Sequence, residues 1–442
     1  MQQAVETKQS PLERQLTVAV PIAQLESEIS DRLKKLARTV KMQGFRPGKV
    51  PMKMVERHYG FQVRQEVLSD SVVKSFDDAV REANYRVAGT PRFEPVAAGE
   101  GATAVQYQAV FEVYPEITLG ELAAVSVKRP VTPVTEADVD RTLETLRKQR
   151  AKFKPAGRAA QAGDLVNIDF TGKIDGEAFE GGSGSNFTVV LGEGRMLPDF
   201  EKALAGLSKG ETKTFPIVFP EDYVEHLRGK TAEFTVTAND VAEPDLPPVD
   251  AEFAKSLGVA DGDVARMRAE IRQNIEREVK KRIAGRVKEQ VMEGLVDCAS
   301  FDVPRSLVDS QVGRMREEAV EELKNRGMTT DNLQLPAELF VERAERRVKL
   351  GLVVGDLVRA NALSARPEQV RQVIEEHAES FEQPEEMVRW FYGQRDRLAE
   401  VEALCVEDNV VEWSLARMKV SDESTPFDDL MGTKQAQGAT DA

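Results

Sequence analysis

The residue types that most often carry nucleophilic or metal chemistry are few in this chain and lie far apart. The 442 residues include two cysteines, Cys298 and Cys405, and three histidines, His58, His226 and His377. Neither cysteine has a CxxC partner or a histidine beside it, and no histidine belongs to a metal-binding or triad pattern. The sequence therefore predicts no metal site, no cofactor and no disulfide framework. We expect both cysteines to be buried as small apolar residues.

A short basic loop offers a different chemistry, which is contact with an acidic partner. The stretch GFRPGKVP, residues 44–51, places one aromatic ring and two cations between residues that end one helix and start another. Residues 31–57 hold nine Lys or Arg against two Asp or Glu, a balance of +7 in a chain of net charge -15. A charged helix face is usually only solvated. Because prolines stiffen the loop around Phe45, Arg46 and Lys49, we favour docking onto carboxylates or phosphates.

The loop lies between two predicted helices of a small α+β domain. Residues 12–20 and 102–115 alternate apolar and polar side chains, which predicts strands. Between them, apolar residues at steps of three and four predict a helix that starts at Ile22 and ends at Gly44, and Pro51 suits the first turn of a second helix. The sequence thus predicts a helix-loop-helix that projects from a domain of residues 1–115.

The central part of the chain has the pattern of a small β domain. Residues 161–246 contain short alternating runs separated by glycines. The cluster GGSGS at 181–185 lacks the GK[ST] ending of a P-loop, so we expect a mobile turn there. Residues 116–160 form a proline-broken linker with one helix, for which Thr135 and Asp138 are the predicted capping pair.

The remaining sequence predicts helices followed by a tail. In residues 247–420, one apolar stripe runs from Val264 to Leu295 in steps of four after a first step of three, so it winds around its helix and its packing partners must change. Further helices are predicted at 305–326, 337–361, 367–379 and 385–416. Small, polar and acidic residues at 421–442 predict a disordered tail. Periodicity alone leaves open whether the helices form a surface for unfolded chains, an ordinary bundle or a dimer interface.

The ordered motifs of residues 161–246, from GDLVNIDFTGKIDGEAFEGG to AEFTVTANDV, resemble the FK-type immunophilins, which are peptidyl-prolyl isomerases. The resemblance implies an apolar pocket formed by Phe170, Phe179, Phe187, Met196, Leu197, Phe200, Tyr223 and Phe234. Glu180 stands where the family usually has an aspartate, and Phe200 where many members have a tryptophan. The family's long pocket loop is replaced by VEHLRGK, from which we expect peptide turnover without tight binding of drug-type ligands. The alternative is that these rings are only the core of a β domain.

The whole chain is similar to the bacterial trigger factor family, through GFRPGKVP, the central domain and the stretch FDVPRSLVDSQV at 301–312. This resemblance implies that the loop docks beside the ribosomal exit tunnel, on a ribosomal protein and nearby RNA. The implied docking residues are Gly44, Phe45, Arg46, Pro47, Gly48, Lys49 and Pro51. It also implies a multidomain α+β fold with an N-terminal α+β domain, a central FKBP-like β domain with a short helix, and a C-terminal all-α domain whose arms hold unfolded nascent chains.

Composition limits the remaining alternatives. No apolar run approaches the roughly 18 residues of a membrane span, and the first residues lack the apolar core of a signal peptide, so we expect a cytoplasmic protein without a membrane partner. The leading hypothesis is an ATP-independent ribosome-associated chaperone with a built-in isomerase. The alternatives are a free cytosolic isomerase whose helical domains only oligomerise it, and an adaptor whose loop binds another acidic partner. A homodimer away from the ribosome is also kept open.

Overall fold

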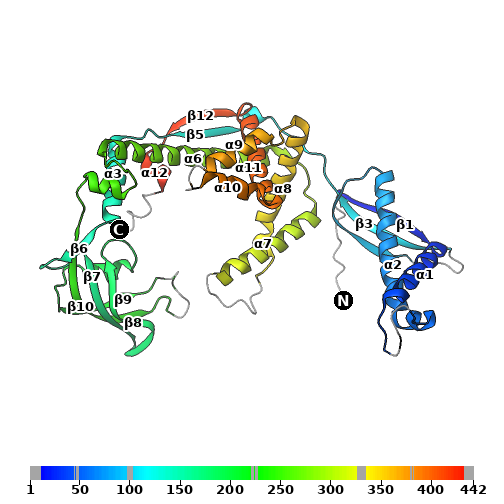
Figure 1. Cartoon of the computed structure of the whole chain (residues 1–442), viewed down its shortest axis with the longest axis horizontal. Coiled ribbons are helices and arrows are strands. Elements are labelled where there is room, and N and C mark those ends of the chain that lie inside the picture. Colours follow the sequence, from blue (N-terminus) through cyan, green and yellow to red (C-terminus); the bar gives the residue numbers. More distant parts are fainter. Residues whose placement is uncertain are drawn as a thin grey trace, which may run out of the picture. The chain divides into compact units, whose positions relative to one another are not determined.

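The computed structural model describes residues 11–43, 45, 49–96, 103–220, 223, 227–325, 335–378, 381 and 383–432, apart from the side chain of Glu180 (Figure 1). The chain divides into two compact units. One comprises Met1–Val127 with Gln290–Lys419, and the other Lys128–Glu289 with Val420–Ala442. Helices and strands occur in both units, so the predicted multidomain α+β fold is confirmed.

The first unit begins with a three-stranded antiparallel sheet and two helices. Its elements are β1 (Glu13–Pro21), α1 (Ile22–Thr39), α2 (Met52–Glu82), β2 (Val87–Pro95) and β3 (Ala104–Val113). The strand order is β1-β3-β2, and alternate residues such as Val18 and Val20 are buried. The apolar stripe of α1 buries Leu25 and Leu33 against α2 and the sheet. The period-2 and helical patterns of the sequence therefore correspond to real elements.

Helix α1 ends earlier than its apolar stripe predicts. We expected its end at Gly44, but the helix stops at Thr39 and Val40 has an extended backbone, with φ -65° and ψ 136°. Val40 and Val50 are both buried in the same core. These two valines anchor the ends of the segment that joins α1 to α2, so the exposed part of the connection is short.

The first unit also contains most of the helical sequence. Its further elements are β4 (Thr118–Leu119), η1 (Leu122–Ala124), the start of β5 (Ser126–Val131), β11 (Ala299–Ser300), α7 (Arg305–Asn325), α8 (Glu338–Asn361), α9 (Pro367–Ala378), α10 (Pro384–Tyr392) and α11 (Arg395–Leu415).

The prediction of a single helix at 385–416 is wrong, because two helices, α10 and α11, cover these residues. Gln394 is extended, with φ -136° and ψ 130°, and it separates α10 from α11 directly after Gly393.

The start of α7 is joined to the N-terminal sheet by hydrogen bonds. The carboxylate of Glu112 accepts from the backbone N–H of Arg305 at 3.1 Å and of Ser306 at 2.7 Å, while the Ser306 hydroxyl donates to the Ala88 carbonyl at 2.9 Å. A carboxylate at this position satisfies free N–H groups of the first helical turn and stabilises the positive end of the helix dipole. Gly89 has φ +76°, and an added Cβ there would lie 2.5 Å from the Ser306 hydroxyl oxygen. The contact therefore requires glycine.

The second unit contains a β domain and a separate helical core. The elements of the helical core are α3 (Glu136–Gln149), α5 (Ala251–Ser256), the first part of α6 (Val264–Cys298) and α12 (Phe427–Met431). The predicted cap of α3 is confirmed, because the Asp138 carboxylate accepts from the Thr135 backbone N–H at 2.9 Å. Val139 and Leu143 of α3 share one apolar core with the stripe of α6.

The winding stripe of α6 changes its packing partners, as predicted. Residues from Met267 to Val279 pack in the core shared with α3. Farther along the helix, an added Cβ at Gly294 would lie 2.5 Å from Val125, so that turn packs closely against the segment before β5. The helix therefore packs against α3 along its first part and against the segment before β5 near its end.

The predicted disorder of the tail is wrong for residues 421–432. Strand β12 (Lys419–Ser424) pairs with β5, and Lys128–Glu423 and Arg129–Asp422 ion pairs join the two strands at 3.3 and 2.7 Å. Helix α12 follows, and its Leu430 is 1% exposed. The acidic residues that suggested disorder are matched by cations almost 300 positions earlier, which composition does not reveal. Residues 433–442 lie outside the described part of the chain.

Two further expectations concern membrane spans and cysteines. Within the described ranges, no helix combines the length and the apolar character that a bilayer crossing requires. Cys405 is buried as predicted, whereas Cys298 is only partly buried. Burial raises the pKa of both thiols, which disfavours the reactive thiolate.

Candidate functional sites

The predicted pocket residues belong to a five-stranded antiparallel sheet and one short helix. The strands are β6 (Lys152–Pro155), β7 (Leu165–Ile174), β8 (Glu177–Val190), β9 (Thr212–Val218) and β10 (Thr231–Asp245), in the order β6-β10-β7-β8 with β9 also paired to β10. Helix α4 (Pro198–Leu204) starts with proline at its first position, where the missing N–H costs nothing. Its Phe200 and Leu204 are buried in the core of this sheet. Because β6 pairs with β10, the sheet begins at Lys152 and not at the expected residue 161.

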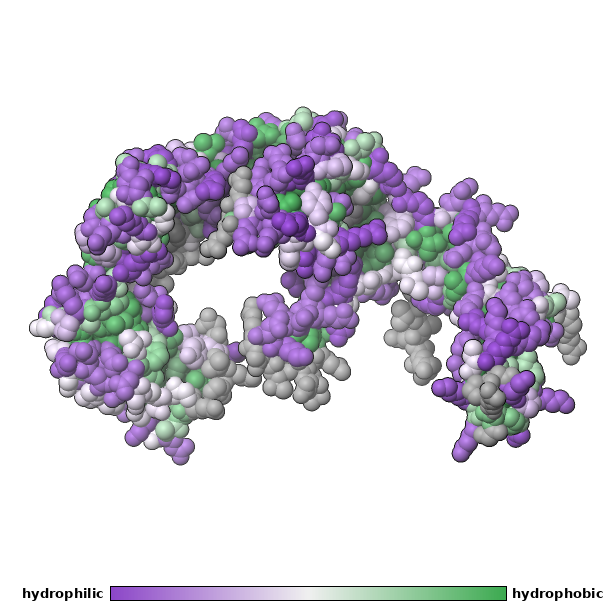
Figure 2. Space-filling view, in the orientation of Figure 1, coloured by the Kyte–Doolittle hydropathy of each residue, from purple (hydrophilic) through white to green (hydrophobic). Residues whose placement is uncertain are grey.

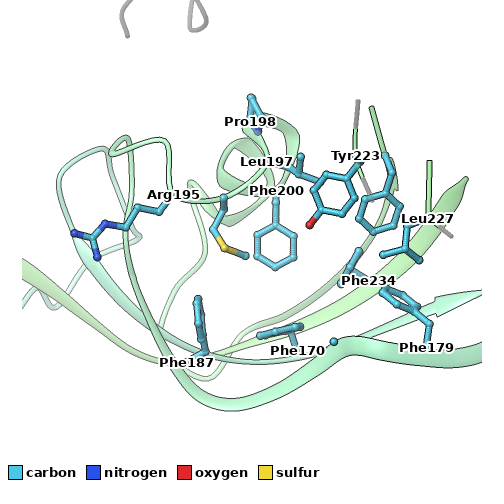
Figure 3. Close-up of a pocket in the computed structure, with 13 residues that line it drawn as sticks. Phe170, Phe179, Phe187, Arg195, Leu197, Pro198, Phe200, Tyr223, Leu227 and Phe234 are labelled. Atoms are coloured by element: carbon cyan, nitrogen blue, oxygen red, sulfur yellow. The ribbon is translucent and has the colours of Figure 1, made fainter. Parts of the chain in front are cut away.

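A cavity of about 620 Å³ opens beside α4 (Figure 3). Eight of the nine residues assigned to the pocket line it: Phe170, Phe179, Phe187, Met196, Leu197, Phe200, Tyr223 and Phe234. The ninth, Glu180, has its side chain outside the described part. Five further lining residues were not predicted, namely Gly181, Arg195, Pro198, Phe219 and Leu227. Phe215, Ile217 and Phe219 alternate with other residues along the sequence and are all buried. This alternation could have predicted that Phe219 faces the interior of the domain.

Phe200 lies at the centre of the ring packing at the base of the cavity. It is 3% exposed, and its ring centroid lies 5.5 Å from that of Phe215 and 6.1 Å from that of Phe170. A third contact, with Phe234, has a centroid distance of 5.3 Å. All three pairs are edge to face, the arrangement that aromatic quadrupoles favour. These contacts fix the orientation of the rings before any ligand arrives.

A second run of rings reaches the rim. Phe179 meets Phe219 edge to face at 6.0 Å, and Phe219 stacks on Tyr223 at 4.9 Å. Figure 3 shows Phe187 and Tyr223 on opposite sides of Phe200. Both rim residues are about two-fifths exposed, at 41% and 39%. The cavity therefore has a buried base and an open rim, which suits a side chain that enters from an extended peptide.

Three glycines leave room for the rings. An added Cβ would lie 2.6 Å from the Phe234 ring at Gly172, 2.7 Å from the Phe170 ring at Gly184, and 2.7 Å from the Phe179 ring at Gly182. The prediction that residues 181–185 form a mobile turn is wrong, because they belong to β8 and Gly184 pairs with Phe170. Their glycines are needed because rings from neighbouring positions cover the strand.

The lining is almost entirely apolar. Among its described residues, only Arg195 and Tyr223 carry polar side-chain groups, and Arg195 pairs with Glu193 at 3.1 Å. The described part of the cavity thus contains no nucleophile and no acid–base pair. It can bind a compact apolar ring and exclude water from the peptide bond next to it.

The loop of residues 44–51, which we expect to dock, is described at three of its assigned residues. Phe45 is 39% exposed, and its backbone N–H donates to the Met42 carbonyl at 3.1 Å. Lys49 is exposed, and Pro51 is the N-cap of α2 with φ -61°. The remaining assigned residues, Gly44, Arg46, Pro47 and Gly48, lie outside the described part. The structure therefore places one aromatic ring and one cation of the loop at the surface.

The helical part carries a third surface, which the sequence did not identify. Phe381, which precedes α10, is 42% exposed, and Trp390 and Tyr392 within α10 are each 49% exposed; the Arg397 guanidinium lies 3.6 Å from the Trp390 ring centroid. The His377 ring is 5.6 Å from that of Phe381. We name Phe381, Trp390 and Tyr392 the aromatic patch. Figure 2 shows that hydrophilic residues cover most of the viewed face, with hydrophobic residues scattered among them. The run of three aromatic residues at 390–392 was the available sequence signal.

Three protein-family models match the chain. The model described as "Bacterial trigger factor protein (TF)" matches residues 1–146, and that of the C-terminus of the same protein matches residues 263–416. The model of the FKBP-type peptidyl-prolyl cis-trans isomerase matches residues 156–239. Together these matches span most of the chain from residue 1 to residue 416.

Curated relatives match over nearly the full length. The trigger factor of Nitrosospira multiformis is 52% identical over 423 residues, which is 95% of this chain and 97% of that protein. The trigger factor of Bordetella pertussis is 52% identical over 435 residues, covering 98% and 100%. A solved structure of a trigger factor chaperone has 19% identity and a TM-score of 0.46, covering 93% of this chain and 98% of that chain, a score too low to compare the folds.

Proposed function

This chain belongs to the bacterial trigger factor family, and from that premise we propose that it docks at the ribosomal exit tunnel in the cytoplasm, holds nascent chains open without ATP and isomerises their X-Pro bonds. Its FKBP-type domain makes it a peptidyl-prolyl cis-trans isomerase. The observation that carries the assignment of the active site is the gathering of eight expected residues around one apolar cavity.

The cavity supports catalysis by differential binding. Rotation about an amide has a barrier of about 18–20 kcal/mol, because planarity preserves the partial double bond between carbon and nitrogen. The planar amide is more charge-separated than the twisted one, so an apolar site that excludes water disfavours the planar state. Lowering the barrier by about 5 kcal/mol accelerates rotation by roughly four orders of magnitude. Preferential binding of the twisted amide can supply this without a nucleophile or metal.

We assign each lining residue a role in isomerisation from its position in the cavity. Phe200 and Phe234 form the base on which the prolyl ring packs, since both are nearly buried and mutually fixed. Phe179 and Phe187, with Met196 and Leu197, form the apolar walls. Tyr223 lies at the rim, where its hydroxyl can donate to a peptide carbonyl. Glu180 keeps the assignment to the catalytic residues that the family motif implies for it.

Docking rests on the loop between α1 and α2. Phe45 enters an apolar notch of the partner, and Arg46 and Lys49 contact carboxylates of a ribosomal protein or phosphates of nearby RNA. The exposure of Phe45 and Lys49 supports this role. Buried Val40 and Val50 fix the two ends of the connection before contact, which lowers the entropy cost of binding.

Holding of nascent chains rests on the aromatic patch of the helical part. Exposed aromatic rings contact many apolar segments without requiring one sequence. Weak contacts of this kind release a client once it buries its own apolar residues, so no ATP is required. An ordinary bundle or a dimer interface would explain the exposed rings differently, and replacing the patch with serine separates the alternatives. Loss of holding with an unchanged oligomeric state supports client contact.

Cosedimentation with vacant ribosomes tests the docking proposal. We expect the wild-type chain to sediment with ribosomes and a chain with Phe45, Arg46 and Lys49 all changed to alanine to stay in the supernatant. A wild-type chain that isomerises peptides but does not sediment would support the free isomerase instead. A chain that sediments independently of the loop would support a different docking surface.

A further inference from the structure

Helix α2 continues the basic surface beyond the docking loop. Lys53, Arg57, Phe61 and Arg64 are all exposed, and Phe61 is 80% exposed. Steps of four, four and three keep these positions within an arc of about 80° on one helix face. We name these four residues the α2 strip. It spans about 16 Å along the helix axis at 1.5 Å per residue.

The α2 strip faces away from the domain core. Val55 and Val63 on the same turns are buried, and helical geometry places them on the opposite side of α2. Phe61 therefore contributes little to the fold. An aromatic ring of this exposure is available to a partner.

The cations of the α2 strip have no acidic partners within the described part of the chain. None of Lys53, Arg57 and Arg64 forms an ion pair there. Two cations of α1 are paired instead, Arg32 with Asp70 at 2.6 Å and Lys34 with Asp31 at 2.9 Å. The hydrogen bond from Lys34 holds the pKa of Asp31 below its ordinary value.

The start of α2 adds to the positive character of the strip. Its first turn contains no acidic residue, and no side chain of the described residues caps it, so no nearby carboxylate offsets the positive end of the helix dipole. Glu56 is the one carboxylate within the first two turns, and it pairs with no cation among the described residues. The strip thus keeps a positive field although the whole chain carries a net charge of -15.

We propose that the α2 strip binds single-stranded or looped RNA, with Lys53, Arg57 and Arg64 on phosphates and Phe61 stacked on an unpaired base. Phosphates are regularly spaced anions, and three cations on one helix face, about 6 Å and about 10 Å apart along the axis at 1.5 Å per residue, can contact several phosphates of one strand. Bases stack on exposed aromatic side chains whatever their sequence. The proposed ribosome docking supplies the location of the RNA, which is ribosomal RNA beside the loop.

The first test uses a fluorescently labelled single-stranded RNA and the full chain. Anisotropy titrations over a range of salt concentrations compare wild type with a strip variant, Lys53→Gln, Arg57→Gln and Arg64→Gln. Removing three phosphate contacts should lower the slope of log affinity against log salt by about 2, at roughly 0.7 per contact on a single strand. Phe61→Ser should weaken binding about tenfold and leave the slope unchanged, because it removes stacking and no charge.

A matched control removes the same charge from the same domain. Lys74→Gln, Arg81→Gln and Arg92→Gln replace exposed cations outside the strip. Glutamine is as good a helix former as lysine and arginine, so the strip variant should fold. Equal affinities and salt slopes for the strip variant and this control would overturn the proposal.

A second test separates RNA from protein as the partner. A photo-reactive phenylalanine analogue at position 61, bound to vacant ribosomes, should form adducts that ribonuclease removes. Adducts with ribosomal protein alone would overturn RNA binding by the strip. Failure of the wild-type chain to sediment with ribosomes would contradict the docking proposal only, since the RNA titration still decides the role of the strip.

Discussion

The ring of Phe200 meets the ring of Phe234 edge to face, with centroids 5.3 Å apart and an interplanar angle of 85°. Phe200 belongs to α4 and Phe234 to β10, so this pair joins the helix to the sheet. It also forms the base of the cavity. The shape of the site and the stability of its domain therefore depend on the same contact.

Phe200→Ala should destabilise the β domain by about 3–5 kcal/mol and remove most isomerase activity, because it deletes a buried ring. Phe187→Ala should lower peptide turnover with little change in unfolding, since its ring is 41% exposed. Thermal unfolding followed by calorimetry, with cis/trans exchange of a prolyl peptide followed by NMR, measures both effects. A folded Phe200→Ala chain with full activity would remove this residue from the site.

Replacing Phe45, Arg46 and Lys49 by alanine should abolish ribosome binding and leave the melting temperature and the isomerase rate nearly unchanged. Phe45 and Lys49 are exposed, so they contribute little to a core. Wild-type binding should also weaken as salt rises, because exposed cations are screened over about 8 Å at physiological ionic strength. Cosedimentation at several salt concentrations measures this, and salt-independent binding would contradict it.

Deleting Lys152–Asp245 should leave a folded chain that still suppresses aggregation. The two ends of this segment pair in register, Lys152 with Asp245, so a short glycine linker can rejoin the chain. The hydrogen bond from the Arg147 guanidinium to the Pro247 carbonyl, at 2.9 Å, lies outside the deletion. Light scattering of a refolding client measures holding. Loss of holding in a folded deletion chain would place the client surface in the β domain.

Leu430→Ala should destabilise the second unit by about 2–5 kcal/mol, the usual cost of removing a buried leucine side chain. Leu430 is 1% exposed in the core of α3 and α6, and Arg286 donates to the Asp429 carbonyl beside it at 2.7 Å. A chain that ends after Gly432 serves as the control and should unfold like wild type. Denaturant unfolding measures both, and equal midpoints for the two variants would show that α12 adds no stability.

The Arg129–Asp422 pair should make the pairing of β5 with β12 sensitive to acid. A hydrogen bond from Arg129 lowers the pKa of Asp422 from its ordinary value. A carboxyl group with a lowered folded pKa stabilises the fold above its unfolded pKa, and this contribution disappears as pH falls through the folded pKa. In Arg129→Gln, the NMR titration of the Asp422 carboxyl should return toward the ordinary value. An unchanged titration would show that Arg129 does not cause the shift.

Much of the fold follows from local patterns in the sequence. Alternation predicted β1 and β3, steps of three and four predicted α1 and α6, and Thr135 with Asp138 predicted the start of α3. These signals are local, because side-chain periodicity and capping depend on residues within a few positions. Local signals fail where a residue far away in the sequence determines the structure. The tail is an example, because its acidic residues pair with Lys128 and Arg129.

The cavity also combines features that local sequence motifs predict with features that depend on contacts between distant residues. The order of motifs identified its aromatic residues, but Gly182 and Gly184 were misassigned to a turn because only the folded rings of Phe179 and Phe170 explain them. Composition and spacing contain no record of such contacts.

The pairing of β12 with β5 has a consequence for how the protein itself is made. Arg129 and Asp422 are 293 positions apart. At about 5–20 residues per second, the ribosome completes Asp422 roughly 15–60 seconds after Arg129. During that interval β5 is an open strand edge, and such edges are sites of aggregation. Each new copy therefore passes through the condition of an incomplete nascent chain, and the holding function that we propose would make it, during its own translation, a client of the copies already present.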